Sequence, residues 1–245
     1  MTGDDYTFFG TKKVSHSSKT NLVNKLFSNV AEKYDLMNDL MSGGIHRVWK
    51  DNFCVALNNP KAKLLDMAGG TCDISRRFYE FAKLNSVEPD ITVCDLNFEM
   101  ILKGREKLFD LGITNVNFVN SPAESLPFKD NSFDYYTVSC GIRNFRDIIS
   151  SLKEAHRVLK KGGTFFCLEF SKPTNEILAS AYEIYSNFVI PNLGAAFGDR
   201  DSYQYLVESI KKFPSQEEFL KLIKDAGFMV ACSWDLSRGV VGRVT

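Results

Sequence analysis

The chain has 245 residues, of which 44% are hydrophobic, and its 30 basic side chains balance 30 acidic ones. A chain of this length can bury one large core, so it needs neither a metal ion nor a disulfide for stability. A net charge of zero argues against a nucleic-acid-binding protein and against a polybasic membrane clamp. The twenty phenylalanines predict a Phe-rich core or, in part, an apolar binding pocket.

The six cysteines and three histidines form no metal-ligand pattern. No C-x-x-C pair is present and the histidines stand far apart, so we expect no zinc site and reduced thiols. Residues 1–20 contain two aspartates and no arginine, whereas a mitochondrial leader is rich in arginine and poor in acids. The expected location is the bacterial cytoplasm, peripheral at the inner membrane. The alternative is a trimmed chain on the matrix side of the inner mitochondrial membrane.

Helical periodicity begins after a polar N-terminus. Residues 1–20 lack periodicity and predict a flexible arm. Apolar residues then recur at steps of four from residue 22, and the pattern continues to residue 58 with an interruption at Gly43-Gly44. Residues 21–58 are therefore expected to form two helices, a helical cover for the part that follows.

Short apolar runs alternate with helical stretches over the middle of the chain. This alternation predicts an α/β fold with a mostly parallel sheet and helices on both faces. Strands are expected at 62–67, 91–94, 115–119, 133–139 and 164–168, and helices at 74–84, 99–111 and 146–159.

Residues 173–213 break the alternation. They are rich in Tyr, Phe and Ile and predict a helical lid insertion, whose apolar side chains line a tunnel or only pack on the rest of the domain. Residues 228–236 and 239–244 could close the sheet as a hairpin. Apart from the arm, residues 21–245 are expected to form a single domain.

The first predicted strand runs into a glycine turn, LDMAGGTCD at residues 65–73. The run lacks the third glycine of a dinucleotide fingerprint, and Asp73 would repel a phosphate. Asp95, at the end of the second strand, is placed to accept both hydroxyls of a ribose. The pair predicts a nucleoside-type ligand without phosphate, such as S-adenosylmethionine, with a purely structural turn as the alternative.

Two stretches carry a specific resemblance. YDLMNDLMSGGIHRVW at 34–49 and RVLKKGGTFFCLEFS at 157–171, supported by SCGIRN at 139–144 and DSYQYL at 201–206, resemble the UbiE-type ubiquinone/menaquinone biosynthesis C-methyltransferases. The resemblance implies a Rossmann-like class I methyltransferase fold with a mostly parallel seven-stranded sheet. It also implies transfer of a methyl group from S-adenosylmethionine to a ring carbon of a polyprenylated quinol.

Several site residues follow from the resemblance and from the glycine turn. The donor, whose product is S-adenosylhomocysteine, is expected to contact Gly69, Thr71, Asp95, Pro122, Ala123 and Ser139, without any metal ion. Asn144 could hydrogen-bond a ring oxygen or serve a turn, and Tyr203 could bind the ring or belong to the core. Cys72 departs from the family pattern, which usually has glycine at this position.

Arg143 is the predicted catalytic residue. An arginine stays protonated, so its expected role is to stabilise a phenolate or to orient a water molecule. The alternative is an ion pair between Arg143 and Asp147. His46 is the rival base, unless it lies on a helix surface, while His156 is expected to be structural. Glu169 ends the fifth strand and could hold helix termini instead of reacting.

Two other functions remain open for this sequence. One is an NAD(P)-dependent oxidoreductase, against which the missing third glycine argues. The other is a non-catalytic lipid-binding subunit of a quinone-biosynthesis complex. The expected partner is a polyprenylated quinol, benzoquinol or naphthoquinol, and no nucleic acid. Peripheral membrane association, membership of such a complex and a homodimer are further arrangements that the sequence allows.

Overall fold

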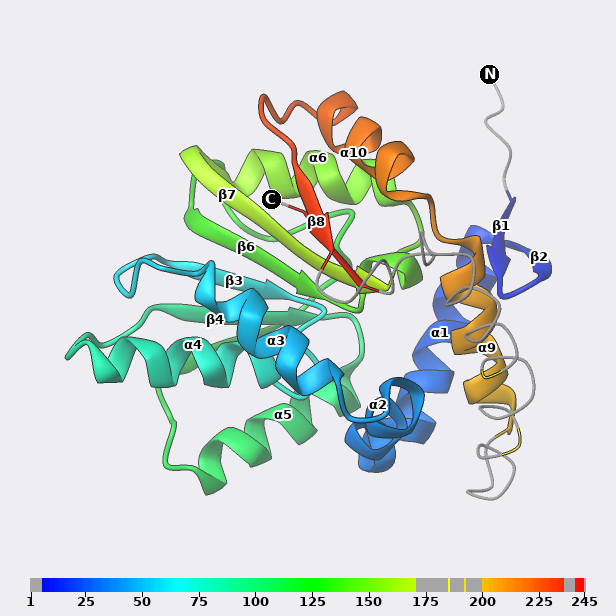
Figure 1. The fold of residues 1–245 in the computed structure, drawn as a ribbon, viewed down its shortest axis with the longest axis horizontal. Helices are drawn as coiled ribbons and strands as arrows, with labels where there is room; N and C mark the ends of the chain where they lie inside the picture. Colours follow the sequence, from blue (N-terminus) through cyan, green and yellow to red (C-terminus); the bar gives the residue numbers. More distant parts are fainter. Residues whose placement is uncertain (1–5, 171–184, 186–191, 193–199, 236–240, 245) are drawn as a thin grey trace.

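The computed structural model describes residues 6–170, 185, 192, 200–235 and 241–244. Its centre is a sheet of order β5-β4-β3-β6-β7-β9-β8 (Figure 1). The expected fold class, α/β with a mostly parallel sheet, is confirmed, and five of the seven strands of the sheet are parallel. These are β3 (Leu64–Met67), β4 (Ile91–Asp95), β5 (Val116–Asn120), β6 (Phe133–Ser139) and β7 (Leu159–Phe170). The antiparallel edge is formed by β8 (Ser233–Asp235) and β9 (Val241–Val244).

Neighbouring residues of one strand belong to two separate hydrophobic cores, one on each face of the sheet. Leu64 and Leu65 are both fully buried, but they belong to different hydrophobic clusters, as Phe165 and Phe166 also do. Adjacent side chains of a strand point to opposite faces, so a strand buried on both faces needs a continuous apolar run. Figure 1 shows α3, α4 and α5 on one side of the sheet and α6 and α10 on the other. These helices are α3 (His46–Val55), α4 (Asp73–Leu84), α5 (Phe98–Asp110), α6 (Ile148–Val158) and α10 (Gln216–Asp225).

The strand order reverses at β3. The chain moves from β3 to β4 and β5 on one side, then returns to place β6 and β7 on the other. The chain therefore builds the sheet outward from β3 in one direction and, from β6, in the opposite direction. In an open α/β sheet this reversal opens a crevice outside the carboxyl ends of the strands, where ligands bind. The topology thus fixes the place of the site beyond Met67, Asp95 and Ser139.

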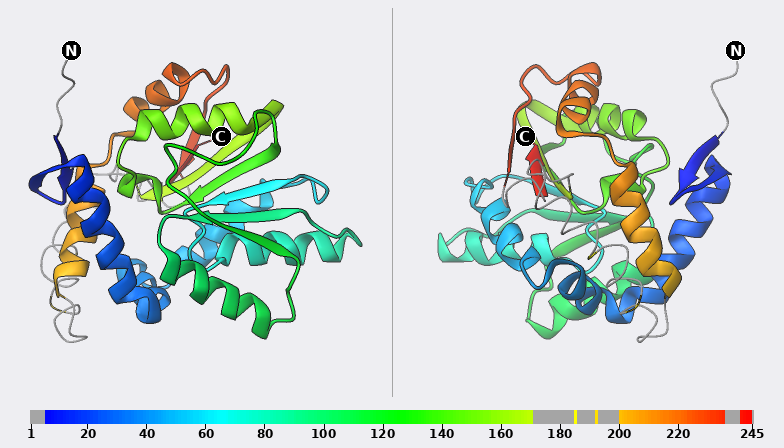
Figure 2. Two further views of the ribbon diagram at one scale, coloured as in Figure 1. Left: turned by 180° about the vertical axis from the view of Figure 1, so that it is seen from behind. Right: turned by 45° about the vertical axis from the view of Figure 1, so that its right-hand side comes forward.

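The N-terminal residues form more structure than the predicted flexible arm. Residues 6–15 form a hairpin of β1 (Tyr6–Phe9) and β2 (Lys12–Ser15), so the prediction is wrong for this part. The hairpin lies beside α1 and α9 (Figure 2), and Phe9 stacks on Tyr205 with 4.2 Å between ring centroids. The cover begins at residue 16 and breaks at the predicted glycine pair, with one more break at 31–33. Its helices are α1 (His16–Val30), the short 3-10 helix η1 (Ala31–Lys33), α2 (Tyr34–Ser42) and α3.

Only part of the predicted lid falls within the described residues. Residues 200–212 form α9 (Arg200–Lys212), which is helical as expected, while most of 173–199 lies outside the described residues. The predicted closing hairpin is confirmed as the antiparallel pair of β8 and β9. Within the described residues, no helix combines the length and the apolar composition that a transmembrane segment requires.

Candidate functional site

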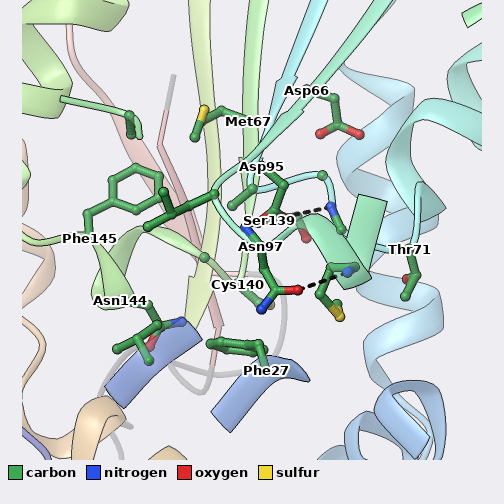
Figure 3. Close-up of a pocket in the computed structure, with 18 of the residues that line it drawn as sticks. Phe27, Asp66, Met67, Thr71, Asp95, Asn97, Ser139, Cys140, Asn144 and Phe145 are labelled. Atoms are coloured by element: carbon green, nitrogen blue, oxygen red, sulfur yellow. Dashed lines mark hydrogen bonds between the residues drawn. The ribbon is translucent and has the colours of Figure 1, made fainter. Parts of the chain in front are cut away.

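A cavity of about 230 Å³ lies at the reversal of the strand order. Its sheet side is formed by residues that follow β3, β4 and β6, and its opposite side by residues of α1, α2 and α3. Figure 3 shows Asp95 and Ser139 on the sheet side and Phe27 across from them. Seven predicted site residues contribute to the lining: Gly69, Thr71, Asp95, Pro122, Ala123, Ser139 and Asn144.

The glycine turn approaches the cavity with a tightly folded backbone. Ala68, Gly70 and Cys72 all have positive φ angles, of 52°, 44° and 63°, a region that favours glycine. A Cβ at Gly69 would meet Val93 Cγ1 at 2.8 Å, so this position excludes any side chain. The family's usual glycine at position 72 is thereby explained, because the cysteine here adopts a left-handed conformation at the start of α4.

Gly104, which the sequence analysis missed, lets α5 approach the glycine turn. A Cβ on Gly104 would stand 2.3 Å from the carbonyl oxygen of Gly70 and 2.4 Å from Cys72 Sγ. Close packing of a helix on a ligand-binding turn is the role of the third glycine in a dinucleotide fingerprint. Here a neighbouring helix supplies that glycine, and the only signal in the sequence was a glycine inside a predicted helix.

Asp95 is held by backbone amides at the mouth of the turn. Its Oδ2 accepts a hydrogen bond from the Gly70 amide at 2.9 Å, and its Oδ1 accepts one from the Asn97 amide at 2.8 Å (Figure 3). Burial raises the pKa of the Asp95 carboxyl to about 6, while these two amides lower it in part. The carboxylate retains further lone pairs, so it can accept hydroxyl donors from a ligand.

Asp66 is the second buried acid of the cavity, but the protein satisfies it. Its Oδ2 accepts from the Ser75 amide at 3.1 Å and the Ser75 hydroxyl at 2.6 Å, and its Oδ1 accepts from the Thr137 hydroxyl at 2.9 Å. Burial raises the pKa of the Asp66 carboxyl to about 6, although these hydrogen bonds lower it in part. Asp66 therefore ties β3 to α4 and β6, a structural task that sequence reasoning did not assign.

Lys50 of α3 reaches the cavity wall beside the glycine turn. Its Nζ lies 2.8 Å from Asp73 Oδ2, and only 6% of the lysine is exposed. Burial lowers the pKa of Lys50, but Asp73 and Tyr34 outweigh it and the net shift is upward, so the ammonium stays charged. The sequence analysis missed Lys50; its signal was a cation beside Trp49 on the buried side of a predicted helix.

The cover is tied to the sheet side through Asn97. Its side-chain amide nitrogen, which has two N–H donors, lies 2.6 to 2.9 Å from three acceptors: the carbonyl oxygen of Asn24, Asn24 Oδ1 and Ser28 Oγ. Its Oδ1 meanwhile accepts from the Met100 amide and caps α5. A second buried contact joins Lys19 Nζ to the carbonyl oxygen of Phe145 at 2.7 Å. Two buried polar side chains thus close α1 over the cavity.

Arg143, the predicted catalytic residue, is buried beside Glu169. It is absent from the lining of the cavity, and its Nη1 donates to Glu169 Oε1 at 2.5 Å and to the carbonyl oxygen of Cys140 at 2.7 Å. Burial lowers the pKa of the guanidinium, but Glu169 outweighs it and raises the pKa above its usual range. The alternative partner, Asp147, is also wrong, because its carboxylate caps α6.

The remaining candidates divide between the cavity and the core. Asn144 lines the cavity, and its Oδ1 accepts from the Tyr205 hydroxyl at 2.9 Å. Tyr203 is buried and does not line the cavity. His46 is buried rather than on a helix surface, bonds to Asp39 at 2.8 Å and lies outside the lining. His156 packs against Phe228, the structural role expected of it.

Within the described residues, Glu169 bonds to Arg143 and to backbone amides, so it holds an internal position rather than a reactive one. Its Oε2 accepts from the Arg143 amide at 3.4 Å and its Oε1 accepts from the Phe170 amide at 2.9 Å. In the part of the chain that the structure describes, no group of three or more His, Cys, Asp or Glu side chains could hold a metal ion.

Comparison with known proteins connects this geometry to one family. Residues 13–244 match the family model described as the ubiE/COQ5 methyltransferase family. The chain is 48% identical over 237 residues to the ubiquinone/menaquinone biosynthesis C-methyltransferase UbiE of Rickettsia felis, covering 96% of each chain. It is 49% identical, with the same coverage, to the protein of that name from Rickettsia bellii.

Solved structures share the fold at low identity. An S-adenosylmethionine-dependent methyltransferase of Thermotoga maritima matches with a TM-score of 0.62 and 19% identity, and the match covers 91% of this chain and 97% of the Thermotoga chain. The [4+2]-cyclase SpnF matches with a TM-score of 0.64 and 17% identity, over 90% of this chain and 77% of its own. Because one of these proteins is a cyclase, the fold alone does not fix the reaction.

Proposed function

The chain belongs to the ubiE/COQ5 methyltransferase family, and from this premise we propose that it methylates a ring carbon of a polyprenylated benzoquinol or demethylmenaquinol in ubiquinone/menaquinone biosynthesis. The methyl donor is S-adenosylmethionine, and the products are the ring-methylated quinol, S-adenosylhomocysteine and the proton that leaves the methylated ring carbon. The observation that carries the proposal is the cavity at the strand-order reversal, which gathers seven of the predicted site residues. Family membership favours this activity over the oxidoreductase and over the non-catalytic subunit.

The cavity's residues fit the donor. Asp95, which two backbone amides hold in place, would accept the ribose hydroxyls. Pro122 and Ala123 offer apolar contact and backbone groups for the adenine, and Ser139 and Thr71 offer hydroxyls. Asp73 at the start of α4 pairs with Lys50, Arg76 and Arg77, so the protein itself compensates its charge. When bound, S-adenosylmethionine supplies an electrophilic methyl group on a cationic sulfur.

The protein's contribution to the reaction is alignment and exclusion of water. A sulfonium methyl is already a strong electrophile, so holding a ring carbon in line with it supplies much of the rate. Asn144, which Tyr205 orients, is placed to hydrogen-bond a ring oxygen as electron density builds on it. Arg143 acts as a positioning residue in this proposal, because its bond to the Cys140 carbonyl fixes the segment that precedes Asn144. The role of Tyr203 at the ring stays a prediction.

Substitution of Asp95 tests the donor site. Asp95→Ala removes the acceptor for two hydroxyls, and we expect the Kd for S-adenosylhomocysteine, measured by calorimetry, to rise about 100-fold, since hydrogen bonds to a charged group are worth about 1.5–3 kcal/mol each. Asp110→Ala, at an exposed acid on the last turn of α5, is the matched control. An unchanged Kd for Asp95→Ala would remove the ribose assignment.

We also propose that the N-terminal hairpin rests on the cytoplasmic face of a bacterial membrane, which would give access to a lipid-borne quinol. Tyr6 and Phe8 are 57% and 47% exposed, and Lys13 and Lys212 lie over their rings at 4.8 and 3.5 Å. Exposed aromatics flanked by lysines suit an anionic lipid interface. This local patch is compatible with a net charge of zero.

Vesicle sedimentation tests the membrane contact. We expect the chain to co-sediment with phosphatidylglycerol vesicles, and Tyr6→Ser combined with Phe8→Ser to reduce the bound fraction at least threefold. Binding that is the same with and without these two rings would refute the surface. Sedimentation velocity without lipid, in turn, tests the predicted homodimer.

A further inference from the structure

The β1–β2 hairpin docks on one face of α9 (Figure 2). Tyr205 and Glu208 stand three residues apart on that helix, so their side chains share a face. The Tyr205 ring stacks on Phe9 with an interplanar angle of 20°. Glu208 Oε2 accepts hydrogen bonds from the amide and the hydroxyl of Thr11, at 2.8 and 3.3 Å. A Cβ on Gly10 would overlap the Glu208 carboxylate, so this glycine lets the hairpin turn close on α9 at a defined position.

The two sides of β1 make different contacts. Successive residues of a strand point to opposite sides. Tyr6 and Phe8 lie on the outer side, where they are 57% and 47% exposed, and they belong to the surface proposed above for the membrane. Phe9 points the other way and packs against the hydrophobic core, so a membrane contact does not account for it.

Tyr205 connects Phe9 to the cavity. The tyrosine is only 4% exposed, and its hydroxyl donates to Asn144 Oδ1 at 2.9 Å. Burial raises the pKa of this hydroxyl above its usual range, so it stays protonated and remains a donor. Asn144 ends the short 3-10 helix η2 (Ile142–Asn144) and lines the cavity (Figure 3). Its side-chain nitrogen bonds to no other described residue, which leaves both N–H groups for a ligand.

We propose that the β1–β2 hairpin positions Asn144 for the acceptor ring, and that Phe9 is a positioning residue that acts through Tyr205. The stacked neighbour fixes the orientation of the Tyr205 ring, and with it the place where the hydroxyl meets the Asn144 amide. An amide that is held in advance donates to a ring oxygen without first reorienting, as electron density builds there. This inference rests on the proposed function, in which Asn144 bonds that oxygen. Phe9 and Tyr205 do not line the cavity, so neither contacts the substrate.

Turnover of a short-tailed acceptor tests the role of Phe9. The probe is 2-prenyl-1,4-naphthoquinol or 2-methoxy-6-prenyl-1,4-benzoquinol, whichever the unmodified chain methylates, supplied without a membrane. For Phe9→Leu we expect kcat per donor site, counted by titration with S-adenosylhomocysteine, to fall about fivefold, an effect of the size that aromatic pairs contribute. The Kd of S-adenosylhomocysteine is expected to change less than about twofold, because the donor site keeps its contacts. Phe9→Tyr, which keeps the stacked ring, should restore kcat.

A double-mutant cycle shows whether the effect passes through Asn144. In an Asn144→Ala chain, Phe9→Leu is expected to lower kcat further by less than about 1.5-fold, because the side chain that it positions is absent. Tyr205→Phe keeps the stacked ring and removes the hydroxyl, so its loss of kcat should match that of Phe9→Leu, and it provides the test if Phe9→Leu does not fold. Phe109→Leu is the matched control, because Phe109 lies on α5 and is 70% exposed. This control should change neither kcat nor the Kd.

The outcomes separate this inference from the proposed function. An unchanged kcat in both Phe9→Leu and Tyr205→Phe, or the same fall of kcat with and without Asn144, would overturn the positioning role and leave the hairpin as a structural brace for α9. Failure of the unmodified chain to methylate both quinols would instead refute the proposed function. Amide hydrogen exchange of residues 142–144 then tests the contact itself. This exchange is expected to accelerate in Phe9→Leu, and unchanged exchange would overturn the inference.

Discussion

The two sides of the cavity are built in different ways. The sheet side consists of strand ends and a glycine turn, where Asp66 and Asp95 are fixed by backbone amides and by side chains of the same layer. The cover side consists of α1 and α2, which reach the sheet side through side chains such as Asn97 and Lys19 and through ion pairs such as Lys107–Asp35. One side is held largely by backbone amides and the other by polar side chains.

This difference suggests a division of labour. A donor site has to be preorganised, and backbone amides provide fixed donors without loss of side-chain entropy. The cover has to open for a ligand to enter, and a region with few buried apolar contacts opens at lower free energy than the core. We therefore expect substitutions on the sheet side to cost folding or donor affinity, and substitutions on the cover side to change opening.

The largest expected effect concerns the Arg143–Glu169 pair at the end of β7. Arg143→Met leaves Glu169 buried without its 2.5 Å partner, so we expect urea unfolding to show a loss of about 3–5 kcal/mol. Arg143→Met combined with Glu169→Met removes both charges and is expected to recover most of this loss, since well-packed apolar replacements of a buried pair are often neutral. No recovery would contradict the structural role of the pair.

The same double variant tests the catalytic role predicted from the sequence. A positioning residue acts through the segment that it fixes, so a folded double variant is expected to retain measurable methyl transfer with a higher KM for the quinol. A folded double variant that binds S-adenosylhomocysteine normally but shows no turnover would restore Arg143 as a catalytic residue. The readout is the ratio of turnover to donor affinity, which the loss of a merely structural residue would not change.

The sheet side could be predicted from the sequence because its signals are local. The strand ends followed from short apolar runs, and Gly69, Thr71 and Asp95 followed from their positions just after those strands. Pro122, Ala123 and Ser139 came from the family resemblance, and they too line the cavity. The α/β class could be predicted from the alternation of short apolar runs, typical of strands, with stretches of helical length.

The cover side could not be predicted because its contacts join distant segments. The hydrogen bonds of Asn97 to Asn24 span 73 residues, and the Lys50–Asp73 contact spans 23; no pattern in one sequence encodes such pairs. Residues 6–15 are polar and short, yet they form a hairpin because α9, almost 200 residues away, offers Tyr205 and Glu208 to pack and bond against. The partner of Arg143 was predicted wrongly for the same reason, because Glu169 lies on the next strand.

Asn97 provides the next largest effect and addresses the cover directly. Asn97→Asp keeps the oxygen that caps α5 but loses the amide donors to α1, so we expect a destabilisation of about 2 kcal/mol. Hydrogen exchange of the α1 amides should accelerate more than exchange in α5. Asn97→Ala, which also loses the cap, is the control and should affect both helices. Unchanged exchange in α1 would mean that another contact holds the cover.

Asp95 also predicts a pH dependence of donor affinity. Burial raises its pKa to about 6, above the usual value of about 3.9 for aspartate, so in the free protein the carboxyl gains a proton as the pH falls through 6. The protonated form is the weaker acceptor, and we expect the affinity for S-adenosylhomocysteine to fall about tenfold from pH 7 to pH 5. Asp95→Asn should flatten this profile. Affinity that rises toward pH 5 would contradict the assignment.

The smallest expected effect belongs to the ion pairs on the outside of the cover. Lys107 and Asp35 lie 2.5 Å apart, but their side chains are 39% and 52% exposed, and exposed pairs contribute between about 0 and 1 kcal/mol. Lys107→Met is therefore expected to lower the free energy of unfolding by less than about 0.5 kcal/mol and to leave α1 exchange unchanged at 0.15 M salt. A loss above about 1 kcal/mol, reduced by added salt, would show that surface charges hold the cover. The contrast between the two sides of the cavity would then rest on electrostatics rather than on Asn97.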